Sequence, residues 1–376
     1  MLKIHEINEF DEFAKLENKW NTVLGESKDD SPLLTWEKMA ASVMFFNKHQ
    51  KLRILYVTDN NNIIGIAPLR QSQITLRGPF GYSVLEPIAY GNTDYSSFIL
   101  SKKTHKCLQI IFTYLYSKND WNYLYINDVP EKSTLLDLLL KNRTLFPRFK
   151  VEKGIRCPYI TIPSTMEELF QNLSANFRKN LRKSLRKLEK YHGKVELKNY
   201  YEIGSLEDTI KIFFNLHQKR WISKGDSGNF SSQEQRDIYL STAKLLAKKN
   251  WFALYFLTVN NKPIAAKYCL KYKQVIYGNL AGLDPSYSTY SVGNLLMFKI
   301  LERCIENKTK EYDFMQGEES YKYKWTKNYC RTYNLEFVNS TFNSQLIRLL
   351  RVTTQKMKIL NLLGRAAGRQ TSLPAR

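Results

Sequence analysis

Hydrophobic residues recur along the chain with two periods, at every second position in some stretches and at every third or fourth position in others. A period of two predicts a half-buried strand, and a period near 3.6 predicts an amphipathic helix. In the first 150 residues these periods predict a strand at 2–7, helices at 9–24 and 31–46 (capped by Ser31), strands at 52–58, 63–70 and 96–100, a helix at 106–117 and a strand at 122–128.

The second half repeats much of this order. The same periods predict helices at 207–225 and 232–249, three strands within 251–284, a helix at 291–307 and a strand at 312–317. In each half an asparagine-rich turn joins two apolar strands, "DNNN" in the first and "NNKP" in the second, which is typical of hairpins. We therefore infer a duplicated α/β unit whose two copies pack as one body.

Charge is distributed unevenly between the two halves of the chain. The chain of 376 residues has a net charge of +22, from 57 Lys/Arg and 35 Asp/Glu. Residues 1–150 hold 19 and 16 of these, a net +3, which leaves 38 and 19, a net +19, for the remainder. An anionic partner is therefore expected for the second half of the chain.

Cysteine and histidine usage gives no sign of a metal or disulfide framework. The five cysteines and five histidines are scattered without ligand spacing, so we expect reduced thiols and no metal site. The first residues are too charged for a secretory signal, and no apolar run approaches the roughly 20 residues of a spanning helix. We expect a cytoplasmic protein, at most peripheral to the inner face of the membrane.

The segment 280–304, "LAGLDPSYSTYSVGNLLMFKILERC", reads as a strand, a short polar loop and a helix. Such a junction turns free backbone N–H groups and the positive end of the helix dipole toward the loop, which suits a phosphate. The loop has neither the GxGxxG nor the P-loop spacing, so a merely capped turn is the alternative.

Several motifs occur in a fairly specific order through most of the chain: "LLTWEKM", "LYVTDNNNIIGIAPL", "GNTDYSSF", "FRKNLRKSLRKLEK", "LHQKRWISKG", "NNKPIAAKYCL", "YSVGNLLMFKIL" and "YDFMQGEESYKYKW". In these the chain resembles the GNAT superfamily of acyl-CoA acyltransferases. More closely, it resembles the CelD/BcsL-type acyltransferases of bacterial exopolysaccharide synthesis, which are double-GNAT proteins related to the FemAB peptidyl-transferases.

The resemblance implies an α/β (α+β) fold of two GNAT-like lobes in tandem, each a mixed central sheet flanked by helices. The expected lobes are 1–150 and 151–340, with a basic helix at 176–190 and a basic amphipathic tail at 341–376. The second lobe would bind acyl-CoA as co-substrate, without a metal. The residues that would receive it are Leu280, Ala281 and Leu283 on the strand and Ser291, Gly293 and Asn294 at the loop and helix.

The resemblance also indicates which residues would carry out the acyl transfer. Acyl transfer to an amine needs an unprotonated nucleophile and a proton for the leaving thiolate. Tyr321 stands where the family's general acid is expected, Asp313 or Glu318 could be the base, and Lys322 could stabilise negative charge or hold a phosphate. The alternatives are a strand-end cap at Asp313, packing at Tyr321, and a helix-surface pair of Glu318 with Lys322.

The acceptor is expected at basic positions of the second half. In the helix at 176–190 the apolar residues form one stripe, and Arg178, Arg182 and Arg186 lie four apart, where guanidinium groups can each engage two phosphate oxygens. A solvated amphipathic helix with excess charge is the alternative. Arg220 matches a recurrent basic position of the family, with an ordinary ion pair as its alternative.

In the first lobe, Asp94 and Tyr95 face the cleft between the lobes or form a plain turn.

The tail beyond residue 340 has seven Lys/Arg and no acid. We expect either an interfacial helix that docks on anionic lipid or a helix packed on the body with a frayed end. The apolar stripe of this helix would be Leu346, Leu349, Leu350, Met357, Leu360 and Leu363.

The expected function is N-acyl transfer from acyl-CoA to an amino sugar or a lipid-linked sugar, in polysaccharide or glycolipid synthesis. The sugar acceptor comes from the resemblance alone. One alternative is a FemAB-like transferase that uses aminoacyl-tRNA. The other is a non-enzymatic basic protein that binds nucleic acid or membrane, although no nucleic-acid-binding motif is present, so a nucleic-acid partner is not expected.

Overall fold

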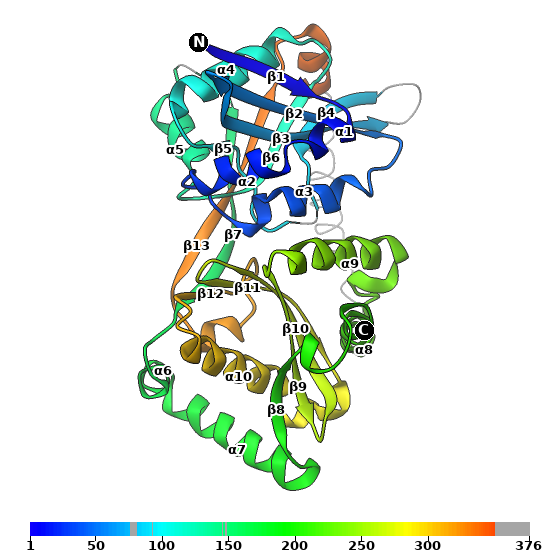
Figure 1. The fold of residues 1–376 in the computed structure, drawn as a ribbon, viewed down its shortest axis with the longest axis vertical. Helices are drawn as coiled ribbons and strands as arrows, with labels where there is room; N and C mark the ends of the chain where they lie inside the picture. The colour runs from blue at the N-terminus through cyan, green and yellow to red at the C-terminus, as the bar shows by residue number, and fades with distance from the viewer. Residues whose placement is uncertain (76–80, 92, 145, 147–148, 350–376) are drawn as a thin grey trace, which may run out of the picture.

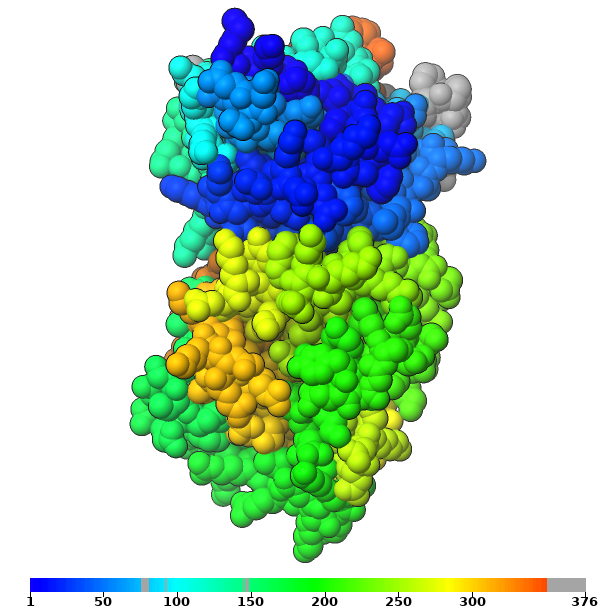
Figure 2. Space-filling view, viewed as in Figure 1, coloured from blue at the N-terminus to red at the C-terminus, as the bar shows by residue number. Residues whose placement is uncertain are grey.

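Two lobes are stacked along the long axis of the molecule in this computed structural model, with the N-terminal residues in the upper lobe of Figure 1. The structure describes residues 1–75, 81–91, 93–144, 146 and 149–349. The lobes meet along a continuous seam in the space-filling view (Figure 2).

The described residues of the first lobe form six strands and five α-helices. Its strands are β1 (Leu2–Ile7), β2 (Gln50–Asp59), β3 (Asn62–Thr75), β4 (Gly81–Pro87), β5 (Ile99–Leu100) and β6 (Tyr123–Pro130). Its helices are α1 (Phe10–Ala14), α2 (Glu17–Gly25), α3 (Trp36–Val43), α4 (Thr104–Ser117) and α5 (Thr134–Lys141), with a short 3₁₀ turn η1 (Pro32–Leu34) before α3.

Residues 149–349 add seven strands and the helices of the second lobe. The strands are β7 (Phe149–Thr161), β8 (Val195–Asn199), β9 (Phe252–Val259), β10 (Lys262–Tyr272), β11 (Val275–Leu283), β12 (Glu311–Asp313) and β13 (Tyr329–Val338). The helices are α6 (Met166–Asn172), α7 (Ala175–His192), α8 (Leu206–Ile222), α9 (Gln233–Lys248) and α10 (Val292–Glu306), with 3₁₀ turns η2 (Tyr200–Glu202), η3 (Asn229–Ser231), η4 (Pro285–Tyr290) and η5 (Lys322–Lys324).

One mixed sheet runs through both lobes, in the order β1-β2-β3-β4-β6-β13-β7-β12-β11-β10-β9-β8. β7 and β13 join the two halves, and both run between the lobes in Figure 1. The last strand of the described residues, β13, lies between β6 of the first lobe and β7, while the end of β7 pairs with β12. The lobe boundary near residue 150 stays a prediction, but these two strands belong to both lobes.

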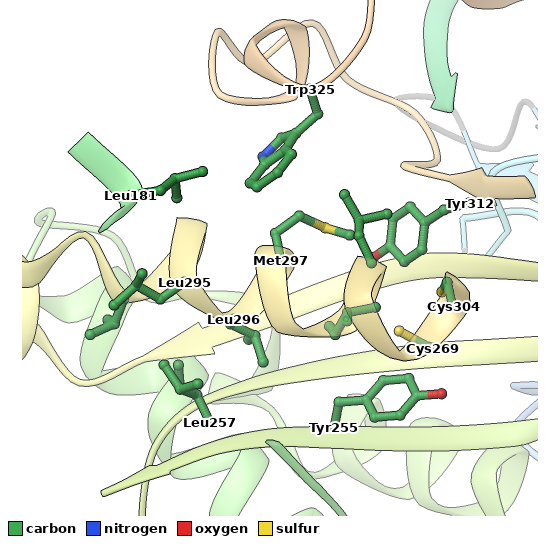
Figure 3. Close-up of a cluster of buried hydrophobic side chains, with 14 of the residues drawn as sticks. Leu181, Tyr255, Leu257, Cys269, Leu295, Leu296, Met297, Cys304, Tyr312 and Trp325 are labelled. Atoms are coloured by element: carbon green, nitrogen blue, oxygen red, sulfur yellow. The ribbon is translucent and has the colours of Figure 1, made fainter. Parts of the chain in front are cut away.

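Both faces of the second-lobe sheet are apolar because helices cover both of them. In β9 the side chains of Tyr255 and Leu257 face α10, and those of Leu254 and Phe256 face α8 and α9. Figure 3 shows α10 in this core, with Leu295, Leu296 and Met297 between the sheet and the side chains of Leu181 and Trp325. The sheet and α10 therefore form a rigid base for the loop that joins β11 to α10.

The two hairpins that suggested a duplication have the same turn. Asn60 and Asn61 have φ of 48° and 67°, and Asn260 and Asn261 have φ of 45° and 67°. Two consecutive residues with positive φ are the signature of a type I′ turn, in which asparagine is favoured. Each hairpin also contains a register shift close to its turn. These shared features support the duplication.

Local structure departs from the sequence expectations at several places. Ser31 and Pro32 begin the short turn η1, and α3 begins only at Trp36, where the Thr35 side chain accepts a hydrogen bond from the Lys38 N–H. The strand expected at 96–100 is reduced to two residues, β5.

The tail stripe is only partly covered by the structure. Residues 342–349 are helical, and the side chains of Leu346 and Leu349 are exposed. The other members of the expected stripe, Leu350, Met357, Leu360 and Leu363, lie outside the described residues. Within the described part of the chain, every helix is too short or too polar for a membrane crossing.

Candidate active site

A pocket of about 370 Å³ opens where β11 runs into η4 and α10. It brings together the end of β11, the first turns of α10, the C-terminal end of α8 and the loop before η5. Its lining includes Arg220, Lys224, Lys267, Ala281, Leu283, Asp284, Ser288, Ser291, Gly293, Asn294, Met297 and Tyr321. Five of the six residues predicted to bind the donor are among these. The sixth, Leu280, packs on the opposite face of the strand, in the core beneath α8.

One edge of β11 is open beside this pocket. β11 pairs with β10 as far as Leu283, but with β12 only from Val275 to Tyr277. β11 and β12 are no longer paired beyond Tyr277. The backbone of β11 from Gly278 onward therefore has no strand partner on this edge among the described residues. An open edge of this kind can hydrogen-bond an extended ligand along its length.

The start of α10 completes the polar side of the pocket. Ser291 precedes the helix in the left-handed conformation, with φ of 51°, and its side chain makes no capping hydrogen bond. In contrast, Ser174, Ser205 and Ser232 cap α7, α8 and α9 with their hydroxyls. The first N–H groups of α10 therefore point at the pocket without a side-chain cap, which favours a bound anion.

Two cations stand at the mouth of this pocket. Arg220 donates one hydrogen bond from Nη1 to the Ala281 carbonyl oxygen at 3.2 Å, which ties the end of α8 to β11. Lys224 lies nearby, with its ammonium over the ring of Trp221. The carboxylate of Asp284 is already paired with Lys219 at 3.2 Å. The uncompensated charge around the opening is therefore positive.

Tyr321 closes the pocket from the loop between β12 and η5. Burial raises the pKa of its hydroxyl to about 12, helped by the nearby Glu319 carboxylate and opposed by Arg220. The phenol is therefore protonated at neutral pH, as a proton donor must be.

Lys267 was not predicted as a site residue, yet it is buried and also lines this pocket. A signal was present, because Lys267 is the one charged residue within the apolar run "PIAAKYCL". Lysine is almost never fully buried unless it is paired or functional. A lysine in the middle of a central strand could thus have been singled out.

Asp313 lies at the contact between the lobes and is not part of the pocket lining. Its carboxylate accepts hydrogen bonds from the Tyr95 hydroxyl at 2.8 Å and from the Met315 N–H at 2.7 Å. Burial raises its pKa to about 7. Asp94 also reaches across, and its carboxylate and backbone oxygens accept hydrogen bonds from Gln316. Asp94 and Tyr95 are therefore lobe contacts, and not a plain turn.

Lys322 and Glu318 do not pair with each other, and neither lines the pocket. Lys322 is buried, and its ammonium donates to the carbonyl oxygens of Met315 at 3.2 Å and Gln316 at 2.6 Å and pairs with Glu319 at 3.0 Å. All three of its donor positions are thus occupied. Glu318 forms an exposed ion pair with Arg156 at 3.4 Å.

The three arginines of the basic helix line a different hollow. Arg178, Lys179, Arg182 and Arg186 surround a surface pocket of about 350 Å³ on α7. Arg178 donates to the Phe170 carbonyl oxygen at 3.0 Å, and the guanidinium of Arg182 lies over the Phe170 ring. The structure brings these arginines together with one another, but not with the pocket at β11.

No group of His, Cys, Asp or Glu side chains in the described ranges could hold a metal.

A known protein family matches the part of the chain that forms this pocket. Residues 175–323 match the sequence profile of the family described as "Acetyltransferase (GNAT) domain". The matched range starts at α7, ends in η5 and includes the whole pocket lining from Arg220 to Tyr321. Among curated protein sequences, no significant match was found.

Solved structures match the tandem arrangement over nearly the whole chain. The crystal structure of FemX has a TM-score of 0.64 at 9% identity, covering 92% of this chain and 99% of FemX. A tandem GNAT protein from the clavulanic acid biosynthesis pathway has a TM-score of 0.52 at 9% identity, covering 90% and 98%. The C-terminal domain of a protein described as a lysylphosphatidylglycerol synthetase, from Agrobacterium fabrum, has a TM-score of 0.52 at 11% identity, covering 91% and 96%.

At such low identity these likenesses show the fold alone, which is the tandem of two GNAT-like lobes expected from the sequence. The family match lies on the lobe that holds the pocket. The second lobe is therefore similar to GNAT acetyltransferase domains over residues 175–323, and this supports an acyltransferase.

Proposed function

We propose that the protein transfers an acyl group from acyl-CoA to an amine, with the donor bound in the pocket between β11 and α10. The observation that carries this proposal is the pocket itself, where an open strand edge, an uncapped helix start and the cations Arg220 and Lys224 surround one cavity. A pantetheine arm has amide groups that can pair with a strand edge, and a pyrophosphate suits the N-terminus of a helix.

In the proposed reaction, the backbone N–H groups on the open edge of β11 stabilise the oxyanion that forms when the amine attacks the thioester. Tyr321 gives its hydroxyl proton to the leaving thiolate. Lys322, with its donors committed to the loop, and Asp313, held by Tyr95, are assigned to positioning that loop. Glu318, exposed and paired with Arg156, is not assigned a chemical step.

For the acceptor we propose an amino sugar, free or lipid-linked, of polysaccharide or glycolipid synthesis. This choice follows the resemblance to CelD/BcsL-type acyltransferases. Support comes from the basic hollow on α7, since Arg178, Arg182 and Arg186 offer guanidinium groups for the phosphates of an activated or lipid-linked sugar.

An aminoacyl-tRNA-dependent transferase is the second candidate. It is favoured by the same basic hollow, which is separate from the donor pocket and could engage a nucleic-acid backbone.

Thermal unfolding with each donor separates the two candidates. Under the first proposal, CoA or acetyl-CoA at 100-fold excess over its Kd raises the melting temperature by about 2 °C or more. Charged tRNA gives no such shift at 0.3 M salt. Stabilisation by charged tRNA alone would contradict the acyl-CoA proposal.

A further inference from the structure

Lys267 is a buried lysine whose side chain reaches the donor pocket from β10. Its side chain is 6% exposed, and in the described part of the chain its ammonium donates one hydrogen bond, to the Asn279 carbonyl oxygen at 3.2 Å. An ammonium has three donors, so two remain for a group inside the pocket. A buried polar group with unused donors beside a cavity is typical of a functional site.

The neighbouring strand is shaped to admit this side chain. Lys267 lies opposite Ala281 in the β10–β11 pairing, and a register shift follows it before Cys269. A Cβ on Gly278 would stand 2.9 Å from the Lys267 Cε and would collide with the Tyr312 hydroxyl. The absence of a side chain at Gly278 therefore leaves space for the aliphatic part of the Lys267 side chain. The bulge changes the direction of the strand at that point.

The environment of Lys267 disfavours its protonated form. Burial lowers its pKa to about 8, and the positive charges of Lys322 and Arg220 act in the same direction, whereas Cys269 and Glu319 oppose them. Tyr321 shares the pocket and Tyr239 donates to the Asn279 side chain at 3.5 Å, so both phenols also face this region. A substantial fraction of Lys267 is therefore neutral at pH 8.

We propose that Lys267 Nζ accepts the proton of the attacking amine, which makes Lys267 a second catalytic residue beside Tyr321. This inference rests on the proposed function. The amine nitrogen forms a bond to the thioester carbon and releases one proton to Lys267, while the C–S bond breaks and the thiolate takes the hydroxyl proton of Tyr321. Proton return from Lys267 to the phenolate, directly or through water, restores both groups, so the net products are the amide and free CoA.

The first test follows Lys267 itself and does not require turnover. The protein is labelled with trace acetic anhydride between pH 6 and 11, with and without CoA, and the modified lysines are identified by mass spectrometry. The exposed Lys271 of the same strand serves as the internal reference. We expect the reactivity of Lys267 to rise at lower pH than that of Lys271, and CoA to slow the labelling of Lys267 but not that of Lys271.

The second test is turnover of Lys267→Met and Lys267→Arg, measured as thiol release from acetyl-CoA with D-glucosamine as the amine. Both variants should lose about 100-fold or more in kcat, and the rise of kcat/KM near pH 8 should shrink to the part contributed by deprotonation of glucosamine itself, while the thermal shift with CoA persists. Because arginine stays protonated, wild-type turnover by Lys267→Arg would assign an electrostatic role to Lys267 and would overturn the proposed proton transfer.

The remaining outcomes separate this inference from the proposed function. If CoA protects Lys267 but Lys267→Met turns over like the wild type, the inference is overturned and the donor pocket stands. If Lys267 follows the pH dependence of Lys271, the inference is likewise overturned. If CoA neither protects Lys267 nor shifts the melting temperature, the donor pocket itself is wrong, and the inference falls with it.

Discussion

Some side chains around the pocket line it, and others fix the conformation of the loops that surround it. Tyr321 and Lys267 line the pocket, whereas Lys322, the direct neighbour of Tyr321, turns away and binds two backbone carbonyls of its own loop. Two adjacent residues of the motif "SYKYKW" thus have opposite orientations. Sequence alone placed both at the chemistry, because orientation within an irregular loop depends on contacts that no periodicity encodes.

Tyr321→Phe removes the proposed proton donor while keeping the ring that closes the pocket. We expect kcat for acyl transfer to fall by about 10²- to 10⁴-fold, as is typical for loss of a general acid. The Kd for CoA should change little, because the donor's phosphates contact other groups. Thiol-release kinetics together with calorimetric titration of CoA check both parts, and unchanged turnover would exclude Tyr321 from the mechanism.

Lys322→Met tests the structural role of the lysine. The substitution leaves the carbonyl oxygens of Met315 and Gln316 without a donor in a buried loop, so we expect a loss of about 2–4 kcal/mol in the free energy of unfolding. Glu318→Gln, at an exposed ion pair, is the control and should change stability by less than about 0.5 kcal/mol. Equal stabilities in denaturant titrations would contradict this assignment.

At the scale of elements, α8 fixes the position of Arg220 by packing directly on β11. Gly282 makes this approach possible, since a Cβ there would stand 2.6 Å from the His217 nitrogen and 2.8 Å from the Leu216 carbonyl carbon. Both are backbone atoms, so the clash cannot be relieved by a rotamer change. Gly282 therefore determines how closely the wall of the pocket that carries Arg220 approaches the strand.

Gly282→Ala should push α8 away from β11. We expect a loss of about 1–3 kcal/mol in stability and weaker binding of CoA, because Arg220 moves with the helix. Gly25→Ala is a matched control, since nothing lies within 4 Å of its added Cβ. Denaturant unfolding and CoA titration measure the two effects, and normal CoA binding by a destabilised Gly282→Ala would contradict the link between α8 and the pocket.

Most elements of the second lobe could be predicted from the sequence, because strong periodicity and clear turn chemistry coincide there. The continuous apolar run of β9 and the paired asparagines at 260–261 are examples. The position of β13 between β6 and β7 could not be predicted, since strand pairing across the whole chain is a tertiary choice. The pocket was located by the strand–loop–helix order, whereas Lys267 was overlooked as part of an apolar strand.

At the scale of the whole molecule, the lobes are joined by strands and by a buried polar contact. Tyr95 of the first lobe donates to Asp313 of the second, and Asp94 accepts from Gln316 of the same loop. Salt bridges between Lys249 and both Glu17 and Glu37 add to the seam, where α3 packs on α9 (Figure 1). The loop that carries Tyr321 is thus anchored to the first lobe as well.

This contact makes stability depend on pH. Burial raises the pKa of Asp313 from 3.8 to about 7, so the folded state holds a proton that the unfolded state releases above pH 4. The stability contributed by this group is complete below pH 4 and is lost as pH rises to 7, by at most about 1.4 kcal/mol per pH unit.

Asp313→Asn cannot titrate at this position, so it should lose less stability than the wild type over this interval. Melting curves of both proteins from pH 4 to 7 check this expectation. A difference in melting temperature that stays constant with pH would contradict the assigned titration.

The central claim is that acyl-CoA binds between β11 and α10. Hydrogen–deuterium exchange of the full chain, with and without CoA, tests it most directly. The account predicts slower exchange of backbone amides in residues 278–294, which cover the open strand edge and the start of α10, with little change along α7. Unchanged exchange in that segment at saturating CoA, or protection confined to α7, would contradict it.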